Sequence, residues 1–212
     1  MTTVPTVFIV DDDAAVLTSL ARLVRSAGYH AVTFSSAGEF LDRVTADTPG
    51  CLVLDVHLPE LSGLDLQQAL ATAGQSLPII FLTGYGDIPM SVRAIKAGAV
   101  DFLTKPCNDK DLLMAIQQAL VQDQQARQAQ ADVADIQQRL ATLTPREREV
   151  LALVIAGQLN KQIAAALGAS EQTIKTHRGR VMEKLQVASL ADLVRLAEKG
   201  GIAPAAAPRQ VN

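Results

Sequence analysis

The first 120 residues repeat one pattern, a short apolar run followed by a longer stretch whose apolar residues recur every three or four positions. A short apolar run between turn residues is typical of a strand that is buried on both faces. The predicted strands are residues 6–10, 31–34, 51–54, 78–82 and 100–103, and a helix is predicted after each of them. Five strands that alternate with five helices predict an α/β fold with a doubly wound parallel sheet and right-handed crossovers.

Residues 109–140 contain neither glycine nor proline. Leu112, Ile116 and Leu120 recur at helical spacing and fit the side of a fifth helix that faces the sheet. Residues 121–140 are rich in Gln, Ala and charged residues, a composition compatible with a flexible linker or with more helix. Because Ala, Gln and Arg are good helix formers, we favour one long continuous helix.

Helix-capping signals are closely spaced beyond residue 140. Thr144 and Glu147 form a capping box around Pro145 at the first helical position. Asn160 and Ser170 are predicted to cap helices over 161–167 and 171–185, which a tight turn at Gly168 and Ala169 separates, and Ser189 opens a last helix. The predicted organisation is a domain at 1–120, a helical linker at 121–140, an all-α four-helix domain at 141–200 and a disordered, Ala- and Pro-rich tail at 201–212.

Charge divides the chain in the same way. Residues 1–120 carry a net charge of −6 and residues 121–212 carry +3, so the two halves are expected to have different partners and the basic half is a candidate for nucleic-acid binding. No apolar run is long enough to span a membrane, and Met1–Pro5 lacks the basic start of a signal peptide. The two cysteines, Cys51 and Cys107, have neither metal-site nor redox-motif spacing, which favours reduced thiols in the cytoplasm.

Polar residues that can take part in a reaction lie at the ends of four predicted strands. They are Asp11 and Asp12, Asp55, Thr83 and Lys105. The carboxyl ends of parallel strands share one edge, so these groups are expected to converge there. Three neighbouring carboxylates repel one another, and a hard cation such as Mg²⁺ relieves the repulsion. With Lys105 and Thr83, such a site can hold a phosphoryl group that is transferred to an Asp oxygen. Taken singly, these residues have plainer interpretations. The acidic run Asp11 to Asp13 fits a cap of the first helix, Asp55 the start of a turn, Thr83 a turn hydroxyl and Lys105 a solvated loop charge.

These residues and their flanking motifs resemble the receiver domain of bacterial two-component response regulators, which has a flavodoxin-like fold. The matching motifs in residues 5–120 are Val10-Asp11-Asp12, Leu54-Asp55 with Pro59 and Gly63 after it, Leu82-Thr83, and Phe102-Leu103-Thr104-Lys105-Pro106. Cys107 departs from the Phe that is common after the Lys-Pro pair, which affects the expected packing there rather than the chemistry.

The resemblance implies a role for each matched residue. Asp55 is the phosphoacceptor, and Lys105 contacts the phosphoryl oxygens and precedes a cis peptide bond to Pro106. Thr83 and Phe102 form a switch pair that reorients on phosphorylation. The implied ligands of Mg²⁺ (or Mn²⁺) are Asp12, Asp55, the backbone carbonyl of His57 and, through water, Asp11.

The second half contains a short helix, a glycine turn and a second helix, which together predict a helix-turn-helix. Gly179 leaves a gap on the outward face of the second helix, and basic residues cluster around it, an arrangement suited to a phosphate backbone. The sequences around Thr144, Asn160, Thr173 and Lys184 resemble the LuxR-type DNA-binding domain more than region four of sigma factors. The implied DNA contacts are Lys161, Gln172, Thr173, Lys175, Thr176, His177, Arg178, Arg180 and Lys184.

Together the two halves resemble the FixJ branch of the NarL/FixJ response regulators over almost the whole chain. The resemblance implies a cytoplasmic regulator whose partner, a sensor histidine kinase, donates a phosphoryl group to Asp55. Phosphorylation is then expected to produce a homodimer that binds double-stranded promoter DNA and activates transcription with RNA polymerase, without a membrane partner. The receiver assists only its own phosphorylation and dephosphorylation, so we expect a regulator rather than an enzyme.

Two other classes of function need comparison. The spacing of Asp11 and Asp13 after the first strand matches phosphatases of the haloacid dehalogenase type, although these need a cap domain that has no counterpart here. An RNA-binding antiterminator is the third class, and the predicted helix-turn-helix argues against it.

Overall fold

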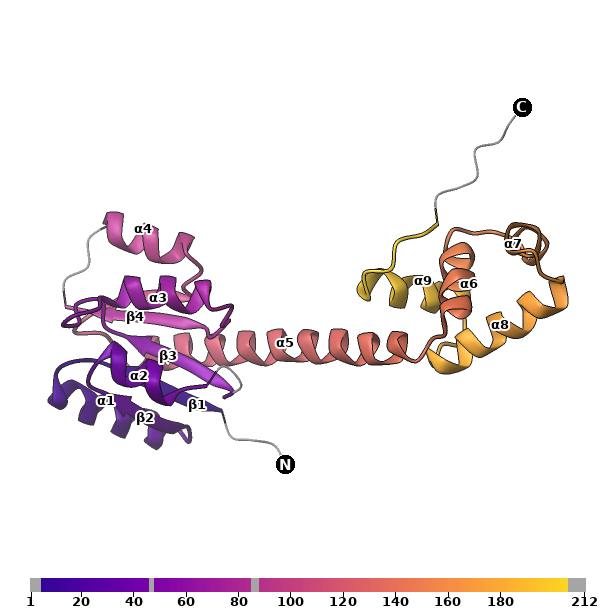
Figure 1. The fold of residues 1–212 in the computed structure, drawn as a ribbon. Coiled ribbons are helices and arrows are strands. Elements are labelled where there is room, and N and C mark those ends of the chain that lie inside the picture. Colours follow the sequence, from indigo (N-terminus) through magenta and orange to yellow (C-terminus); the bar gives the residue numbers. More distant parts are fainter. Residues whose placement is uncertain (1–4, 46–47, 85–87, 206–212) are drawn as a thin grey trace. The chain divides into compact units, whose positions relative to one another are not determined.

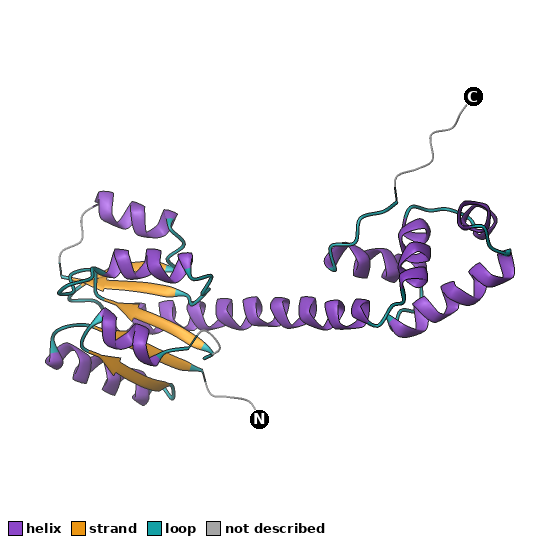
Figure 2. Cartoon of the chain, in the orientation of Figure 1, coloured by secondary structure: helices purple, strands orange, loops and turns teal. Residues whose placement is uncertain are grey.

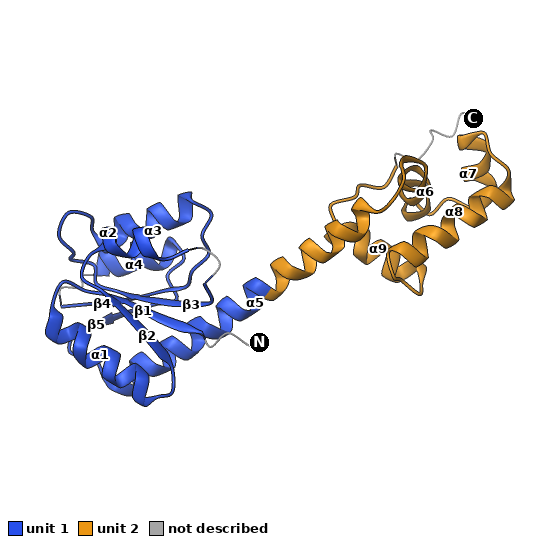
Figure 3. Ribbon diagram, turned by 60° about the horizontal axis from the view of Figure 1, so that its bottom comes forward, with its two compact units in different colours: residues 1–127 blue, residues 128–212 orange. Residues whose placement is uncertain are grey.

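The computed structural model describes residues 5–45, 48–84 and 88–205. The chain forms two compact units that divide between Arg127 and Gln128 (Figure 3). The long helix predicted over 109–140 is confirmed as α5, Asp109–Ala141, which crosses this division. The stretch predicted as a linker is therefore shared, with its start in the first unit and its end in the second.

The first unit contains a five-stranded parallel sheet in the order β2-β1-β3-β4-β5, which confirms the predicted fold class (Figure 2). Each strand begins and ends within one residue of its prediction. The strands are β1 Thr6–Val10, β2 His30–Phe34, β3 Gly50–Leu54, β4 Ile79–Thr83 and β5 Asp101–Thr104. The helices that alternate with them, besides α5, are α1 Ala14–Ser26, α2 Ala37–Arg43, α3 Gly63–Thr72 and α4 Ile88–Lys96 (Figure 1).

The two faces of the sheet bury separate cores, as expected for central strands, β1, β3 and β4, that are buried along their whole length. Alternate residues of each strand point to opposite faces. Phe8, Leu52 and Phe81 pack with α2, α3 and α4 on one face. Val7, Val53 and Ile80 pack on the other face with α1 and the first turns of α5. The five strands are thereby held in register with their carboxyl ends along one edge.

The second unit contains the end of α5 and the helices α6 Pro145–Ile155, α7 Asn160–Leu167, α8 Glu171–Lys184 and α9 Leu190–Lys199. Ile136 and Leu140 of α5 are buried in its core with residues of the other four helices. The predicted capping box is present, because Thr144 Oγ1 accepts a bond from the Glu147 N–H and the Glu147 carboxylate accepts one from the Thr144 N–H. No helix in the described part of the chain is long and apolar enough to cross a membrane.

Two local predictions for this unit were wrong. Asn160 does not cap α7 but is its first residue, and the Leu159 N–H is satisfied instead by the side chain of Gln162. The tail is not disordered from residue 201, because Ile202 packs on the helical core and the Ala205 N–H donates to the Ala152 carbonyl. Residues 206–212, the rest of the predicted tail, lie outside the described residues.

Candidate functional site

A pocket of about 350 Å³ lies at the carboxyl edge of the sheet. Four strands bring their terminal residues to it, because β1 leads into Asp11 and Asp12, β3 into Asp55, β4 ends at Thr83 and β5 leads into Lys105. The convergence predicted from parallel strands is thus present in the structure. The lining is completed by Asp13, Val16, His57 and Gly84.

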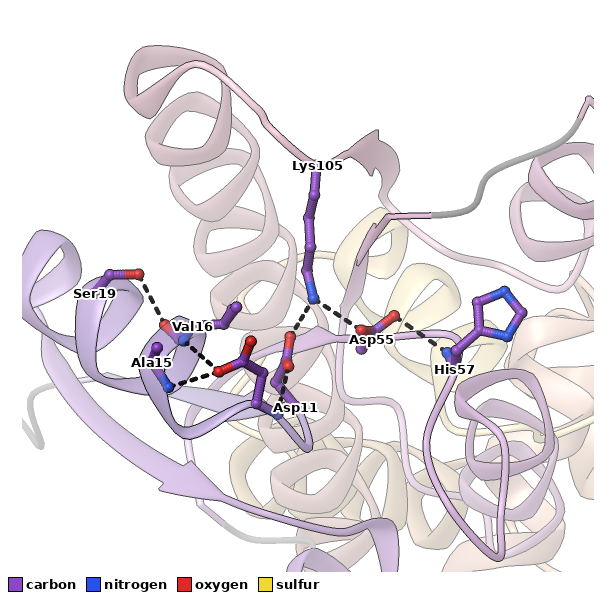
Figure 4. A network of polar contacts seen from close by, with 8 residues as sticks. Asp11, Ala15, Val16, Ser19, Asp55, His57 and Lys105 are labelled. Carbon is purple, nitrogen blue, oxygen red and sulfur yellow. Dashed lines mark hydrogen bonds and ion pairs between the residues drawn. The ribbon is translucent and has the colours of Figure 1, made fainter.

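Lys105 joins the carboxylates of two different strands (Figure 4). Its ammonium nitrogen lies 2.5 Å from Asp11 Oδ2 and 2.8 Å from Asp55 Oδ2. Burial acts to lower the pKa of Lys105, but its hydrogen bonds to Asp11 and Asp55 outweigh that effect and raise the pKa above its ordinary value. The lysine is therefore held in its charged form between the two acids.

Asp11 is almost completely buried, and this burial raises its pKa against the opposing effect of Lys105. Carboxylate oxygens of Asp11, Asp12 and Asp55 all lie within 4.8 Å of one another, an arrangement that can hold a metal ion. Lys105 offers one positive charge to these three acids, so the pocket retains an unbalanced negative charge. Clustered oxygen donors with excess negative charge suit a hard divalent cation.

Asp13 has a different role from its two neighbours. Its carboxylate accepts hydrogen bonds from the Ala15 and Val16 N–H groups and so caps the start of α1. The plain interpretation of the acidic run as a helix cap therefore holds for Asp13, while the side chains of Asp11 and Asp12 belong to the acidic cluster.

The loop after β3 holds Asp55 in place. The His57 N–H donates to Asp55 Oδ1 at 3.1 Å, which fixes one carboxylate oxygen while Lys105 holds the other (Figure 4). Gly63 begins α3 directly against this loop, and a Cβ there would lie 2.2 Å from the Asp55 carbonyl oxygen. Only glycine allows this approach, which explains its place eight residues after Asp55.

The predicted switch residues lie on neighbouring strands. Thr83 is fully buried and lines the pocket, and its carbonyl oxygen accepts a bond from the Lys105 N–H. Phe102 is half-buried on β5, and its ring packs on Phe81 with 5.9 Å between ring centroids. The peptide bond between Lys105 and Pro106 is cis, as the resemblance implied.

In the second unit, α7 and α8 form the predicted helix-turn-helix, with Gly168 between them in the left-handed conformation at φ 61°. Ile163 and Ile174 anchor the two helices in the core, so their opposite faces are turned to solvent. An added Cβ at Gly179 would meet no atom within 4 Å, which confirms an open position on α8. The predicted DNA contacts that are exposed here are Lys161, Gln172, Thr173, Lys175, Thr176 and Arg180.

Three of the predicted DNA-contact residues are partly buried within the second unit. Lys184 forms a 2.7 Å ion pair with Glu147 of α6, whose side chain is only 3% exposed, and it also donates to the Thr142 carbonyl. Arg178 donates to Asn160 Oδ1 across the turn. His177 is half-buried, with Nδ1 enclosed and without a hydrogen-bond partner. Lys184 and Arg178 therefore support the helix-turn-helix from within.

Sequence reasoning missed other charged residues that tie this unit together. Arg146 donates to the Leu167 carbonyl at the end of α7, and Arg148 donates to the Leu140 carbonyl at the end of α5. Their place next to the capping box was visible in the sequence, but a surface arginine gives no local signal for a partner so far along the chain.

Comparison with known proteins agrees with both halves. Residues 7–117 match the family described as response regulator receiver domain, and residues 141–197 match bacterial regulatory proteins of the luxR family. The chain is 52% identical to Nodulation protein W of Bradyrhizobium diazoefficiens over 92% of this chain and 86% of that protein. It is 43% identical to transcriptional regulatory protein FixJ of the same species, over 95% of this chain and 98% of that one.

A solved structure supports the same assignment. The response regulator StyR is 48% identical and aligns with a TM-score of 0.86 over 93% of this chain and 100% of its own. A receiver domain implies a sensor kinase as partner, and a LuxR-type domain implies binding to DNA. The chain therefore belongs to the FixJ-type response regulators, the transcription regulators of two-component systems in which a receiver domain precedes a LuxR-type DNA-binding domain.

Proposed function

We propose that a sensor histidine kinase phosphorylates this protein on Asp55, and that the phosphorylated form dimerises, binds promoter DNA and activates transcription. The observation that supports this best is the pocket in which Asp55 meets Lys105 and two further carboxylates, in the same chain as a helix-turn-helix. The only reactions that the receiver assists are its own phosphorylation and dephosphorylation.

Asp55 supplies the nucleophile. One of its oxygens forms a bond to phosphorus while the bond from phosphorus to the imidazole nitrogen of the kinase breaks, and the imidazole leaves with that electron pair. His57 N–H and Lys105 orient the carboxylate through Oδ1 and Oδ2. Lys105 and the Thr83 hydroxyl then hold the phosphoryl oxygens, since phosphoryl transfer depends on positioning and charge neutralisation.

Mg²⁺, or Mn²⁺, is the cofactor we propose for the pocket. The carboxylates of Asp12 and Asp55 and the backbone carbonyl of His57 would ligate it, and Asp11 would bind it through water. The close oxygen donors and the excess negative charge described above fit such an ion. When bound, the cation neutralises charge on the transferred phosphoryl group.

Phosphorylation of Asp55 adds about one negative charge, because the phosphoryl group carries about two and the carboxylate loses its own, and it brings new acceptor oxygens beside Thr83. We propose that the Thr83 hydroxyl turns to the phosphoryl group and that Phe102 moves with it, because both lie on the strands that border the pocket. This change on β4 and β5 would favour a homodimer, and contact of the bound dimer with RNA polymerase would activate transcription. The protein would work in the cytoplasm.

For DNA contact we propose the exposed residues of the helix-turn-helix. Lys161, Lys175 and Arg180 would bind phosphates, and the open position at Gly179 would let the backbone of α8 approach the duplex. Gln172 and Thr176 are polar and exposed on the same helix, so they are candidates for contact with base edges.

A phosphatase of the haloacid dehalogenase type is less compatible with the geometry. Such an enzyme needs the carboxylate two residues after its nucleophile for proton transfer. Here Asp13 has that position, and its carboxylate is bonded to two backbone N–H groups at the start of α1. A function as an RNA-binding antiterminator is not compatible with the match of residues 141–197 to the luxR family of regulatory proteins.

Binding sites selected from random-sequence DNA with the acetyl-phosphate-treated chain provide a direct test. Affinity for such a site is then measured for the wild type and Asp55→Asn, each with and without acetyl phosphate and Mg²⁺. Treatment should raise the affinity of the wild type by roughly ten-fold or more, because a dimer meets its second half-site at high effective concentration. Equal affinities for treated and untreated wild type would contradict the proposal.

A further inference from the structure

A second polar network lies at the opposite edge of the sheet from Asp55, where β3 begins. Asp123 of α5 accepts a hydrogen bond at 3.0 Å from the N–H of Gly50, a residue 73 positions away in the sequence. Arg127, one helical turn later, donates to both oxygens of Asp123 at 2.9 Å and to the Thr48 carbonyl at 2.8 Å. We name these four residues, Thr48, Gly50, Asp123 and Arg127, the amino-edge clamp.

The clamp is a partly buried network rather than a surface ion pair, because the Asp123 side chain is 5% exposed and that of Arg127 is 30% exposed. Asp123 is only 4% exposed, although its neighbours Gln122, Gln124 and Gln125 are exposed. Gly50 packs so tightly on β1 that a Cβ would lie 1.9 Å from the Thr6 carbonyl oxygen. Its buried N–H needs a partner, and the Asp123 carboxylate provides it. Asp123 in turn needs Arg127, because an unpaired buried carboxylate is costly.

We propose that Asp123 and Arg127 are positioning residues that fasten α5 to the start of β3 and pass changes in the receiver to the helix that leads into the DNA-binding unit. The coupling part of this inference rests on the proposed function. Gly50 and Asp55 are the two ends of one short segment, five residues apart and about 16 Å in length. The strand that carries the phosphoacceptor is thus bonded directly to α5 at its other end.

The position of the clamp also determines where the receiver ends along α5. The buried apolar residues of α5 in the first unit end at Ala119, so packing alone would release the helix there. Asp123 and Arg127 extend its attachment by two further turns, to the point at which the first unit ends. A helix segment held by so few polar contacts is sensitive to loss of any one of them.

Hydrogen exchange of the full chain tests the attachment. Asp123→Asn keeps an acceptor for Gly50 but removes the charge that pairs with Arg127, and Arg127→Met removes the bond to Thr48. Amides in residues 121–130 should exchange about ten-fold faster in both variants, as expected for loss of a charge-assisted bond. The control is Asp132→Asn, since Asp132 is exposed on the same helix and bonds only to Gln128 among the described contacts. Wild-type exchange in both clamp variants would overturn the proposal.

DNA affinity measured with and without acetyl phosphate and Mg²⁺ tests the coupling. In Asp123→Asn the increase in affinity on phosphorylation should fall several-fold relative to the wild type, while intact mass shows the same phosphorylation of Asp55. An unchanged increase would mean that the clamp is structural and would overturn the coupling. If the wild type itself shows no phosphorylation, the proposed function fails, and the exchange rates still decide whether the clamp holds α5.

Discussion

Replacing Lys184 by methionine separates two roles for this residue, DNA contact and internal support. The Lys184 side chain extends from α8 toward α6, and its ammonium group lies 2.7 Å from Glu147 Oε2 and 3.1 Å from the Thr142 carbonyl. Methionine keeps most of the aliphatic volume but removes the charge. Glu147 would then remain buried with its bonds to Thr144 and without a positive partner.

The size of the effect follows from this burial. Removal of one partner from a buried ion pair costs about 3–5 kcal/mol, because the other charge is left without compensation. Glu147 is 3% exposed, but the Lys184 side chain is 33% exposed, so water can partly replace the ammonium group. We therefore expect a loss of about 2–3 kcal/mol in unfolding free energy, below the range for full burial. For a domain of this size, that corresponds to a fall in Tm of roughly 10–20 °C.

Calorimetry of the full chain measures this change in the transition of the second unit. The double variant Lys184→Met with Glu147→Gln should recover much of the lost stability, because it leaves no buried charge behind. DNA affinity, measured at a temperature where all variants are folded, should change little in Lys184→Met. If instead Tm is unchanged while DNA affinity and its salt dependence fall, Lys184 is a phosphate contact and the reasoning from the ion pair is wrong.

Four further variants can be measured on the same chain. Hydrogen bonds from Lys184 and the Thr144 N–H lower the pKa of Glu147 from 4.5 to about 2. The stabilising effect of Glu147 is therefore complete above pH 4.5 and is lost as the pH falls toward 2. Urea denaturation should show this pH dependence in the wild type but not in Glu147→Gln. Lys175→Ala should reduce the salt slope of DNA binding by about 0.9, and an unchanged slope would exclude a phosphate contact. Gly50→Ala should destabilise the receiver by about 1–3 kcal/mol through overpacking against the Thr6 carbonyl, whereas Gly179→Ala, which has open space, should stabilise α8 by about 0.5–1 kcal/mol and weaken DNA binding if the duplex approaches there.

The receiver was predictable because its determinants are local. The central strands β1, β3 and β4 are nearly continuous apolar runs. In a parallel sheet, the residue that follows a strand lies at a known edge. Asp55, Thr83 and Lys105 could therefore be brought together from their order along the chain alone. The long helix was predictable for a similar reason, since 109–140 contains no residue that breaks a helix.

The partners of charged side chains could not be predicted from the sequence, because they are set by which distant segments lie close together in the fold. Lys184 and Lys175 have the same character in the sequence, yet one pairs with Glu147 and the other is exposed. Asp123 gave no signal in a Gln-rich stretch, because its partner Gly50 lies on a strand formed much earlier in the chain. Asn160 was misplaced by one residue because the helix starts from Leu159, whose carbonyl accepts bonds from the Gln162 and Ile163 N–H groups.

Phosphorylation of Asp55 is the central claim, and intact-mass measurement tests it most directly. The wild type and Asp55→Asn are treated with acetyl phosphate and Mg²⁺ under the same conditions. We predict one added phosphoryl group on the wild type and none on the variant, because the Asp55 carboxylate lies at the pocket between Lys105 and the His57 N–H. Labelling of Asp55→Asn at the wild-type level would contradict the account.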